Sequence, residues 1–498
     1  MRELHSIADN IDLLKGTEIF IYGDGLYGSM TCRYLSCLGI RAASVLVSDI
    51  AGKQELFHGV PVEAFEAEKQ RIRGNTVILA MSEKHAGTVQ ESVLACEPAY
   101  IVRVSGDLYQ EMLRYFYSSL PIVRNKLFVS CFFGKGGFRD NPRAVVEEIF
   151  RRKKTGDPIA GDIDIVWELA DPEGVSMPEG IRVVKEKTEE YYRELNSAGV
   201  ILINDYPGIN GLVKKEQQFI VNTWHGTGPF KTVYNATADF PEEERERLKK
   251  DISQTDAMIC AAKQYHDAYQ SAFLYHGTIY DYGYPRNDVL LRDAERKACW
   301  EKIRSFYGIR DTEKIVLYAP TFRHNGQDGF GMYDLGMDQV LSALEKRFGS
   351  SFRLLYRYHH VLWHDLKREK KFADGIDATD YPDIMDLLAA ADVLITDYSS
   401  CMWDFSLMYR PVFLYHKDIS EYEDDRGFFW PPERWPYPRA HSTEEMCDEI
   451  LHFDEDAYHR ALDRFFEEDP SYDDGHASER VVDLIEDVMV HPEKYGKA

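Results

Sequence analysis

Short runs of apolar residues recur along the whole chain, and a stretch with helical periodicity follows nearly every one of them. Such runs are typical of buried strands, and strands that alternate with helices form parallel sheets covered by helices. The predicted strands span residues 18–22, 43–48, 76–81, 125–129, 163–167, 181–184, 200–204, 219–223, 314–319, 352–356, 393–396 and 412–414. The pattern therefore predicts an α/β protein.

The strands fall into three blocks, as expected for 498 residues at about 150 residues per domain. Residues 1–120 are predicted to form a small Rossmann-like accessory domain. Residues 121–278 and 279–498 form two similar α/β units in series, the last with acidic helices at its end. We expect two Rossmann-like domains that face each other, because ligands of open α/β sheets bind beyond the carboxyl ends of the strands.

A glycine-rich turn follows the first predicted strand, with glycines at Gly23, Gly25 and Gly28 before a helix. Asp49 ends the next strand, about 20 residues on, where a ribose-binding acid stands in dinucleotide-binding domains. The turn predicts a dinucleotide or nucleotide site in this domain. A tight turn alone also requires glycines, so the motif indicates the fold more strongly than the ligand.

The composition excludes several classes of protein. With 59 Lys and Arg against 84 Asp and Glu, the net charge is −25, which argues against a nucleic-acid partner. The 8 cysteines show no CxxC spacing and are expected to be free thiols. We expect a cytoplasmic protein, since no apolar run of about 18 residues and no export signal is present. HExxH, GxSxG and P-loop motifs are missing from the sequence, and no metal site is predicted.

The loop after the strand at 219–223 carries the first candidate catalytic group, His225. A histidine at the carboxyl end of a strand faces the ligand cleft and can deprotonate an attacking hydroxyl group. Gly226, Thr227 and Lys231 follow it and are candidate substrate contacts. A lone histidine would more often be a structural cap, but the glycine, threonine and lysine around it favour catalysis.

Polar and basic residues also follow three strands of the last block and the junction between the last two blocks. Hydroxyl and backbone N–H groups at a helix start can cradle phosphate, and arginine neutralises phosphate oxygens. The candidates are Arg286, Thr321, Arg323, Arg357, His359, Asp397, Ser399 and Ser400. Together they predict a phosphate-binding cleft.

Five ordered motifs resemble those of the CDP-glycerol glycerophosphotransferases of teichoic-acid synthesis. They are Trp224-His225-Gly226-Thr227, Gly283-Tyr284-Pro285-Arg286-Asn287-Asp288, Tyr318-Ala319-Pro320-Thr321-Phe322-Arg323, Arg357-x-His359 and Leu394-Ile395-Thr396-Asp397-Tyr398-Ser399-Ser400. Gly134-Lys135 followed by Asp140-Asn141-Pro142 also matches. The resemblance spans roughly residues 121–475 and leaves the first 120 residues outside.

The resemblance implies a GT-B fold and transfer of glycerol phosphate from CDP-glycerol to an acceptor hydroxyl, with CMP leaving. His225 resembles the base, and His359 the group that stabilises the transferring or departing phosphate. The implied pyrophosphate contacts are Arg286, Thr321, Arg323, Ser399 and Ser400. The implied acceptor is a cell-surface glycan, a lipid-linked molecule or a polyol-phosphate chain, as in teichoic-acid or capsule synthesis. No required cofactor or metal is implied.

Alternatives stay open at this point. The donor could be CDP-ribitol, or a nucleotide sugar used by a GT-B glycosyltransferase. The glycine turn would also suit an NAD-binding oxidoreductase or sensor module. A basic run at residues 151–154 predicts peripheral contact with the inner leaflet of the membrane, unless it is only a solvated helix end. Acceptor identity, priming against polymerisation, the role of the first domain and the oligomeric state do not follow from the sequence.

Overall fold

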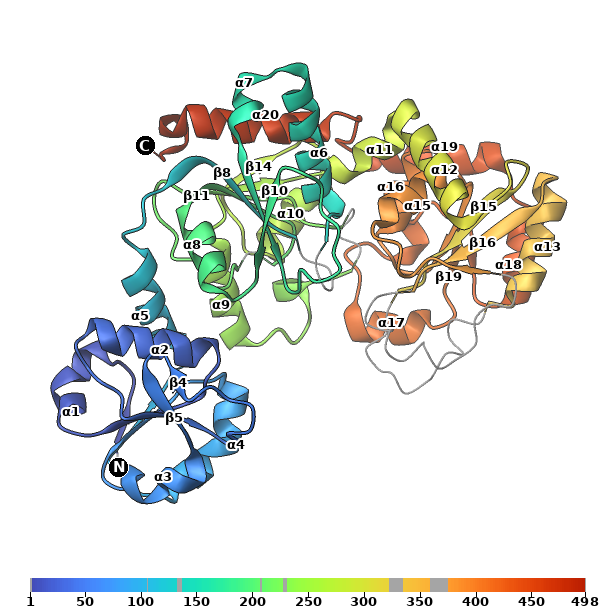
Figure 1. The fold of residues 1–498 in the computed structure, drawn as a ribbon. Coiled ribbons are helices and arrows are strands. Elements are labelled where there is room, and N and C mark those ends of the chain that lie inside the picture. Colours follow the sequence, from blue (N-terminus) through green and yellow to red (C-terminus); the bar gives the residue numbers. More distant parts are fainter. Residues whose placement is uncertain are drawn as a thin grey trace. The chain divides into compact units, whose positions relative to one another are not determined.

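The protein folds into three mostly parallel sheets, each covered by helices (Figure 1). The structure is a computed structural model that describes residues 2–104, 106–131, 137–206, 208–226, 231–321, 335–358 and 375–497. The chain divides into two compact units. The first contains residues 1–122 with 185–197 and 210–215, and the second contains the remainder. The prediction of an α/β fold with three Rossmann-like sheets is confirmed.

The sheet of the first unit has the strand order β1-β7-β6-β2-β3-β5-β4. Its strands are β1 (Arg2–Leu4), β2 (Ile19–Tyr22), β3 (Ser44–Val47), β4 (Leu56–Phe57), β5 (Val60–Ala64), β6 (Thr76–Leu79) and β7 (Tyr100–Arg103). Its helices are α1 (Ile11–Lys15), α2 (Leu26–Cys37), α3 (Phe65–Ile72), α4 (Glu83–Leu94), α5 (Gly106–Tyr117) and α8 (Glu189–Ser197). The central order is that of a Rossmann half, so the turn between β2 and α2 lies where the order reverses.

The second sheet opens the second unit, with the order β10-β9-β8-β11-β12-β13-β14. Its strands are β8 (Val123–Ser130), β9 (Asp164–Leu169), β10 (Ile181–Lys185), β11 (Ala198–Ile203), β12 (Phe219–Asn222), β13 (Ala257–Ile259) and β14 (Thr278–Tyr280). Its helices are α6 (Asp140–Thr155), α7 (Pro158–Asp162), α9 (Glu242–Ile252) and α10 (Gln264–Ser271). The β11 strand is buried along its whole length, as expected for the middle of a parallel sheet.

The third sheet has the order β17-β16-β15-β18-β19-β20. Its strands are β15 (Lys314–Tyr318), β16 (Phe352–Tyr356), β17 (Ile376–Asp377), β18 (Val393–Thr396), β19 (Val412–Tyr415) and β20 (Arg439–Ala440). The helices that follow β14 are α11 (Asp288–Leu291), α12 (Asp293–Tyr307), α13 (Met337–Phe348), α15 (Ile384–Ala390), α16 (Cys401–Ser406), α17 (Ile419–Arg426), α18 (Thr443–Leu451), α19 (Glu455–Glu468) and α20 (Ala477–Val490).

Helix α20 returns to the second sheet at the end of the chain. Its apolar face, with Val481 and Ile485, belongs to the same buried core as β8 and β12. The carboxylate of Asp288 accepts hydrogen bonds from the backbone of Ala477 and Ser478 and so caps the first turn of α20. The junction between the two sheets therefore holds the returning helix in place.

Asp473, just before α20, is a buried acid at this junction. It accepts bonds from the backbone N–H of Tyr284 (2.7 Å) and from Asn287 (3.1 Å). Burial raises the pKa of Asp473 to about 7. A carboxyl whose pKa is higher when folded stabilises the fold at low pH, and that contribution is lost as the pH rises through 7.

We therefore expect Asp473→Asn to stabilise the protein more at pH 8 than at pH 5, by on the order of 3 kcal/mol, because the contribution is lost gradually from about pH 4 to pH 7. The asparagine oxygen can still accept the Tyr284 N–H. Urea unfolding at both pH values measures the effect. Asp474→Asn is the matched control, because Asp474 is exposed and pairs with Arg480. An equal effect of both substitutions, or no gain at pH 8, would contradict the expectation.

The basic run at residues 151–154 makes contacts within the second unit. Arg151 and Arg152 bind Glu148, and Arg152 also binds Asp483 and Glu486 on α20 at 2.7 and 2.8 Å. Lys153 donates to the carbonyl of Ile163. Arg152 and Lys153 thus attach α6 to its neighbours, and Arg151 is paired within α6, so the run offers less charge to a lipid surface than the sequence pattern indicated.

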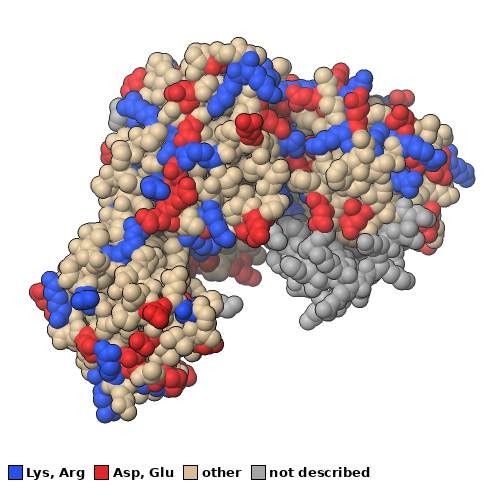
Figure 2. Space-filling view, in the orientation of Figure 1, with Lys and Arg blue, Asp and Glu red and all other residues tan. Residues whose placement is uncertain are grey.

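Charge is mixed on the protein surface. On the face drawn in Figure 2, Lys and Arg side chains are interspersed with Asp and Glu. All 8 cysteines are free thiols, as predicted. Among the described residues, no helix combines the length and the apolar character needed to cross a membrane.

Candidate active site

His225 lies just beyond the carboxyl end of β12, where the sequence predicted it. Its ring Nδ1 is 2.7 Å from the carbonyl oxygen of Asn204 and 3.3 Å from a carboxylate oxygen of Asp205. A carbonyl oxygen only accepts hydrogen bonds, so Nδ1 carries the proton and Nε2 keeps its lone pair. This tautomer is the one that a general base needs.

Asp205 can stabilise the histidine after proton uptake. The two side chains are both about one-fifth exposed. Burial raises the pKa of the Asp205 carboxyl, while the nearby His225 lowers it. A carboxylate beside an imidazole favours the imidazolium that forms when the base takes a proton.

The loop after His225 lies beside segments of the third sheet. A Cβ atom placed on Gly226 would be 3.6 Å from Oγ of Ser400. Lys231 pairs with Phe428 in an isolated β-bridge, and its ammonium lies 5.6 Å from the centre of the Tyr422 ring. The structure thus brings the predicted residues His225, Gly226, Lys231 and Ser400 into one region.

Asp397 joins the loops that follow β15 and β18. Its carboxylate accepts bonds from the backbone N–H of Thr321 (2.9 Å), the hydroxyl of Thr321 (2.6 Å) and the N–H of Tyr398 (2.6 Å). These bonds hold the two adjacent strand ends together. Ser399 and Ser400 follow directly and lead into α16. Asp397 therefore fixes the backbone at the start of the predicted phosphate loop.

Arg286 is a buried link between the two sheets of the second unit. Its guanidinium binds Asp140 (2.9 Å), Asp404 of α16 (2.8 Å) and the carbonyl oxygen of His225 (2.6 Å). Burial acts against its charge, but the carboxylates of Asp404 and Asp140 outweigh it and raise the pKa. These partners already engage both terminal nitrogens, so the predicted pyrophosphate contact of Arg286 stays a prediction.

Arg357 follows β16 and points at backbone. Its Nη1 donates to the carbonyl oxygens of Ala378 (3.1 Å) and Tyr381 (2.5 Å), and burial lowers its pKa. The structure thus gives Arg357 a loop-fixing contact. Thr227, Arg323 and His359 lie outside the described residues, as does the Gly134-Lys135 motif.

The glycine turn of the first unit is built as the sequence predicted. Gly23 has φ +122°, and a Cβ on it would lie 2.6 Å from the carbonyl oxygen of Ala80. A Cβ on Gly28 would lie 2.0 Å from that of Gly23, while one on Gly25 would meet nothing within 4 Å. Gly23 and Gly28 thus serve close packing, and Gly25 leaves room over the turn. Asp49 is exposed beyond β3.

Among the described residues, one group has ligand atoms close enough to hold a metal ion: Cys260, His266 and Asp281. The Cys260 thiol is fully buried, donates to the carbonyl of Ala262, and has its pKa raised by burial. A protonated, buried thiol is a poor metal ligand, since metals bind the thiolate. His266 and Asp281 already pair with each other at 2.6 Å.

The family model described as CDP-Glycerol:Poly(glycerophosphate) glycerophosphotransferase matches residues 113–487. The chain belongs to this family. The match covers the whole region in which five motifs indicated the resemblance, and it includes both sheets of the second unit. The resemblance predicted from the sequence is confirmed.

Named relatives support this family assignment. The chain is 29% identical over 376 residues to a teichoic acid poly(glycerol phosphate) polymerase of Staphylococcus epidermidis, covering 73% of this chain and 51% of that protein. It is 26% identical to a teichoic acid glycerol-phosphate transferase of Staphylococcus aureus, over 74% of this chain and 94% of that protein. The chain thus spans about half the length of the first relative. Ribitol-phosphate primases and polymerases are also relatives.

The wall teichoic acid polymerase TagF has a similar fold. One of its structures superposes with a TM-score of 0.66 and 25% identity, covering 82% of this chain and 98% of that chain. Another TagF structure was determined after a soak with CDPG. The GT-B fold that the sequence implied is therefore confirmed for this chain.

Several residues near the site were missed in the sequence, among them Asp205 and His416. Both lie within two residues of the end of a strand, β11 and β19, so the rule that found His225 would also have found them. His416 is buried, stacks on the Tyr398 ring at 4.7 Å, and its Nε2 lies 3.2 Å from the carbonyl oxygen of Asp397. It supports the loop that carries Ser399.

Burial lowers the pKa of His416 to about 4. Asp397 acts in the opposite direction, and the charges of Arg439 and His441 add to the lowering. A histidine held neutral when folded stabilises the fold above pH 6.5, and that contribution is lost as the pH falls from 6.5 to 4. We expect His416→Gln to flatten the pH dependence of stability between pH 5 and 7, by about 2 kcal/mol. Thermal unfolding across this range measures it; an unchanged slope would contradict the expectation.

Proposed function

We propose that this chain transfers glycerol phosphate from CDP-glycerol to a hydroxyl group of a cell-surface acceptor and releases CMP. The acceptor is a glycan, a lipid-linked molecule or a polyol-phosphate chain, as in teichoic-acid or capsule synthesis. The observation that carries the proposal is the approach of the His225–Gly226 loop to Ser400. It supports His225 as the base beside the predicted phosphate loop, in a chain of the glycerophosphotransferase family.

The proposed reaction is a single displacement at phosphorus. The acceptor oxygen bonds to the phosphorus that carries glycerol, and the bond from this phosphorus to the oxygen of the CMP phosphate breaks. Nε2 of His225 takes the acceptor proton, and Asp205 stabilises the resulting imidazolium. Ser399, Ser400 and the predicted His359 bind phosphate oxygens. Such transfers depend mainly on positioning and charge stabilisation, which these residues supply.

The test is release of CMP by the purified protein. CDP-glycerol, CDP-ribitol and UDP-sugars are supplied in parallel, each with a glycerol-phosphate oligomer and with a lipid-linked glycan. CMP is measured by chromatography, and the new phosphodiester by phosphorus NMR. Release from CDP-glycerol supports the proposal. Release from CDP-ribitol alone, or UDP from a nucleotide sugar alone, would replace it with the corresponding alternative.

We propose that the protein contacts the cytoplasmic face of the membrane by binding a lipid-linked acceptor. The basic run at residues 151–154 is not needed for this contact. Flotation with anionic liposomes tests it, with and without the lipid-linked acceptor in the bilayer. Binding that depends on the acceptor supports contact through the acceptor. Binding to plain anionic liposomes that disappears on changing residues 151–154 to glutamine would instead support contact through the basic run.

For the first unit we propose that the turn with Gly23, Gly25 and Gly28 accommodates a nucleotide or dinucleotide. Two observations support it: the strand order reverses at this turn, and the space over Gly25 is open. Calorimetric titration of the whole chain with NAD, NADH and UDP-sugars tests it. Equal binding by Gly25→Val, which fills that space, would contradict it.

A further inference from the structure

We propose that Asn141 is a positioning residue of the transfer reaction, acting through His225. Its carboxamide ties the Trp224–His225 turn to the segment that carries Arg286. The proposal rests on the proposed function for the role of His225, and it assigns a role to a residue of the Asp140-Asn141-Pro142 motif for which none was predicted.

The turn that presents His225 has an unfavourable backbone. Trp224 has φ +53°, in the left-handed region that bulky residues rarely adopt. Two carboxamides hold it there: Asn222 accepts the Trp224 N–H at 2.8 Å, and Asn141 donates to the Trp224 carbonyl at 2.9 Å. A strained residue persists only where its surroundings fix it, so these two contacts set the direction in which His225 leaves the strand.

Asn141 is fully buried and its amide has an unambiguous orientation. Its nitrogen faces the carbonyls of Trp224 and, at 3.4 Å, Thr223. Its oxygen accepts the backbone N–H of Arg286 at 3.0 Å. Both ends of the amide are thus used, one on each side of the site. Arg286 also donates to the carbonyl of His225. The carbonyl groups of Trp224 and His225 are therefore held by two residues, Asn141 and Arg286, that are hydrogen-bonded to each other.

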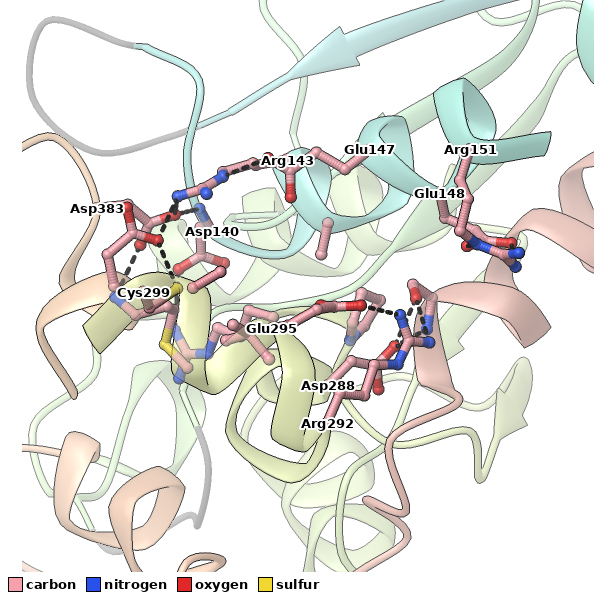
Figure 3. A pocket seen from close by; sticks show the side chains of 18 of the residues that line it. Asp140, Arg143, Glu147, Glu148, Arg151, Asp288, Arg292, Glu295, Cys299 and Asp383 are labelled. Carbon is pink, nitrogen blue, oxygen red and sulfur yellow. Dashed lines mark hydrogen bonds and ion pairs between the residues drawn. The ribbon is translucent and has the colours of Figure 1, made fainter. Parts of the chain in front are cut away.

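The start of α6 anchors Asn141 to the third sheet. The preceding residue, Asp140, donates its backbone N–H to Asp383, which also accepts a bond from Arg143. Asp383 caps α15 of the third sheet by accepting from Met385. Figure 3 shows Asp140, Arg143 and Asp383 together at one end of a cavity of about 350 Å³. Asn141 therefore holds His225 in register with the elements that carry the predicted phosphate loop.

A residue needed only for folding would lower stability without changing the chemistry, and Asn196 provides the matched comparison. Asn196 is also fully buried, donates to two carbonyls (Tyr192 and Gly211) and accepts one backbone N–H (Val213). It lies in the first unit, in which the sequence and structure place none of the transfer residues. Substitution of Asn196 should therefore lower the free energy of unfolding about as much as substitution of Asn141 does.

The experiment compares Asn141→Asp, Asn141→Ser and Asn196→Asp with the wild type. In Asn141→Asp a carboxylate oxygen replaces the nitrogen that donates to Trp224, at nearly unchanged volume. We expect kcat for CMP release to fall about 10- to 100-fold, KM for CDP-glycerol to change less than about 3-fold, and the acidic limb of the pH profile of kcat/KM to move. Asn196→Asp should change neither kcat nor the pH profile.

A second measurement decides the proposal even if the wild type releases no CMP, which would contradict the proposed function alone. In protein labelled with ¹⁵N-histidine, the His225 signal is identified by its loss in His225→Asn. The wild-type signal should have the pattern of the Nδ1-protonated tautomer, and it should shift or broaden in folded Asn141→Ser. An unchanged His225 signal in that variant would overturn the proposal, as would an unchanged kcat and pH profile in an active enzyme. If Asn141→Asp fails to fold, Asn141→Ser supplies both readouts.

Discussion

Replacing His225 with asparagine should reduce the rate of CMP release by about 10²- to 10⁴-fold, the range that general-base catalysis contributes. Asparagine can keep the bond to the carbonyl of Asn204, now through its side-chain N–H, but it cannot take a proton from the acceptor hydroxyl. Binding of CDP-glycerol, measured by calorimetry, should change little, because the base acts on the acceptor. The loss should therefore appear in kcat.

The matched control is His266→Asn. His266 also pairs with a carboxylate, Asp281, at 2.6 Å, but it lies on α10, which carries none of the predicted site residues. It should leave the rate unchanged. Asp205→Asn should slow transfer less than His225→Asn does, since the base remains and only the stabilisation of its charged form is lost. More than a tenth of wild-type activity in His225→Asn would remove His225 from the base role.

The sheets could be predicted from the sequence because buried parallel strands are continuous apolar runs. The strands β2, β8, β15 and β18 were all predicted to within three residues at each end. The strands that were missed are short or lie toward sheet edges, such as β4 and β20. A strand of two residues with one partially exposed face has too few apolar positions to be distinguished from a loop. Such strands form because they pair with a neighbouring strand, and this pairing cannot be predicted from the local sequence.

The candidate site could be predicted only in part, for a related reason. The rule that functional residues follow strand ends located His225, Thr321 and Ser400, since strand ends are visible in sequence. It could not distinguish a side chain that points into the cleft from one that fixes the scaffold. Arg286 and Arg357 were predicted as substrate contacts, yet their described partners are carboxylates and carbonyl oxygens of the protein. The carboxylate partners of Arg286, Asp140 and Asp404, lie more than 100 positions away along the chain, so the local sequence does not reveal them.

Replacing Arg286 with methionine should have the largest effect on stability. Methionine fills much of the same volume, but it leaves the carboxylates of Asp140 and Asp404 buried without their cation; Asp404 is only 2% exposed. Removing one partner of a buried ion pair costs about 3–5 kcal/mol. Urea unfolding should show this loss, and CMP release should fall as well, because the His225 carbonyl loses its donor. Lysine should not restore either property, since a single ammonium cannot replace the fork that reaches three acceptors.

Two further variants separate the charge from the position that it holds. Arg182→Met breaks a bidentate pair with Asp164 on the surface, where both side chains are partly exposed, and should cost less than about 1 kcal/mol. In the triple variant Asp140→Asn, Arg286→Met, Asp404→Asn, the stranded charges are removed, so much of the stability should return. Transfer should nevertheless stay slow, because the carbonyl of His225 still lacks the guanidinium that fixes it. Recovery of full activity along with stability would instead mean that Arg286 serves only to neutralise the two acids.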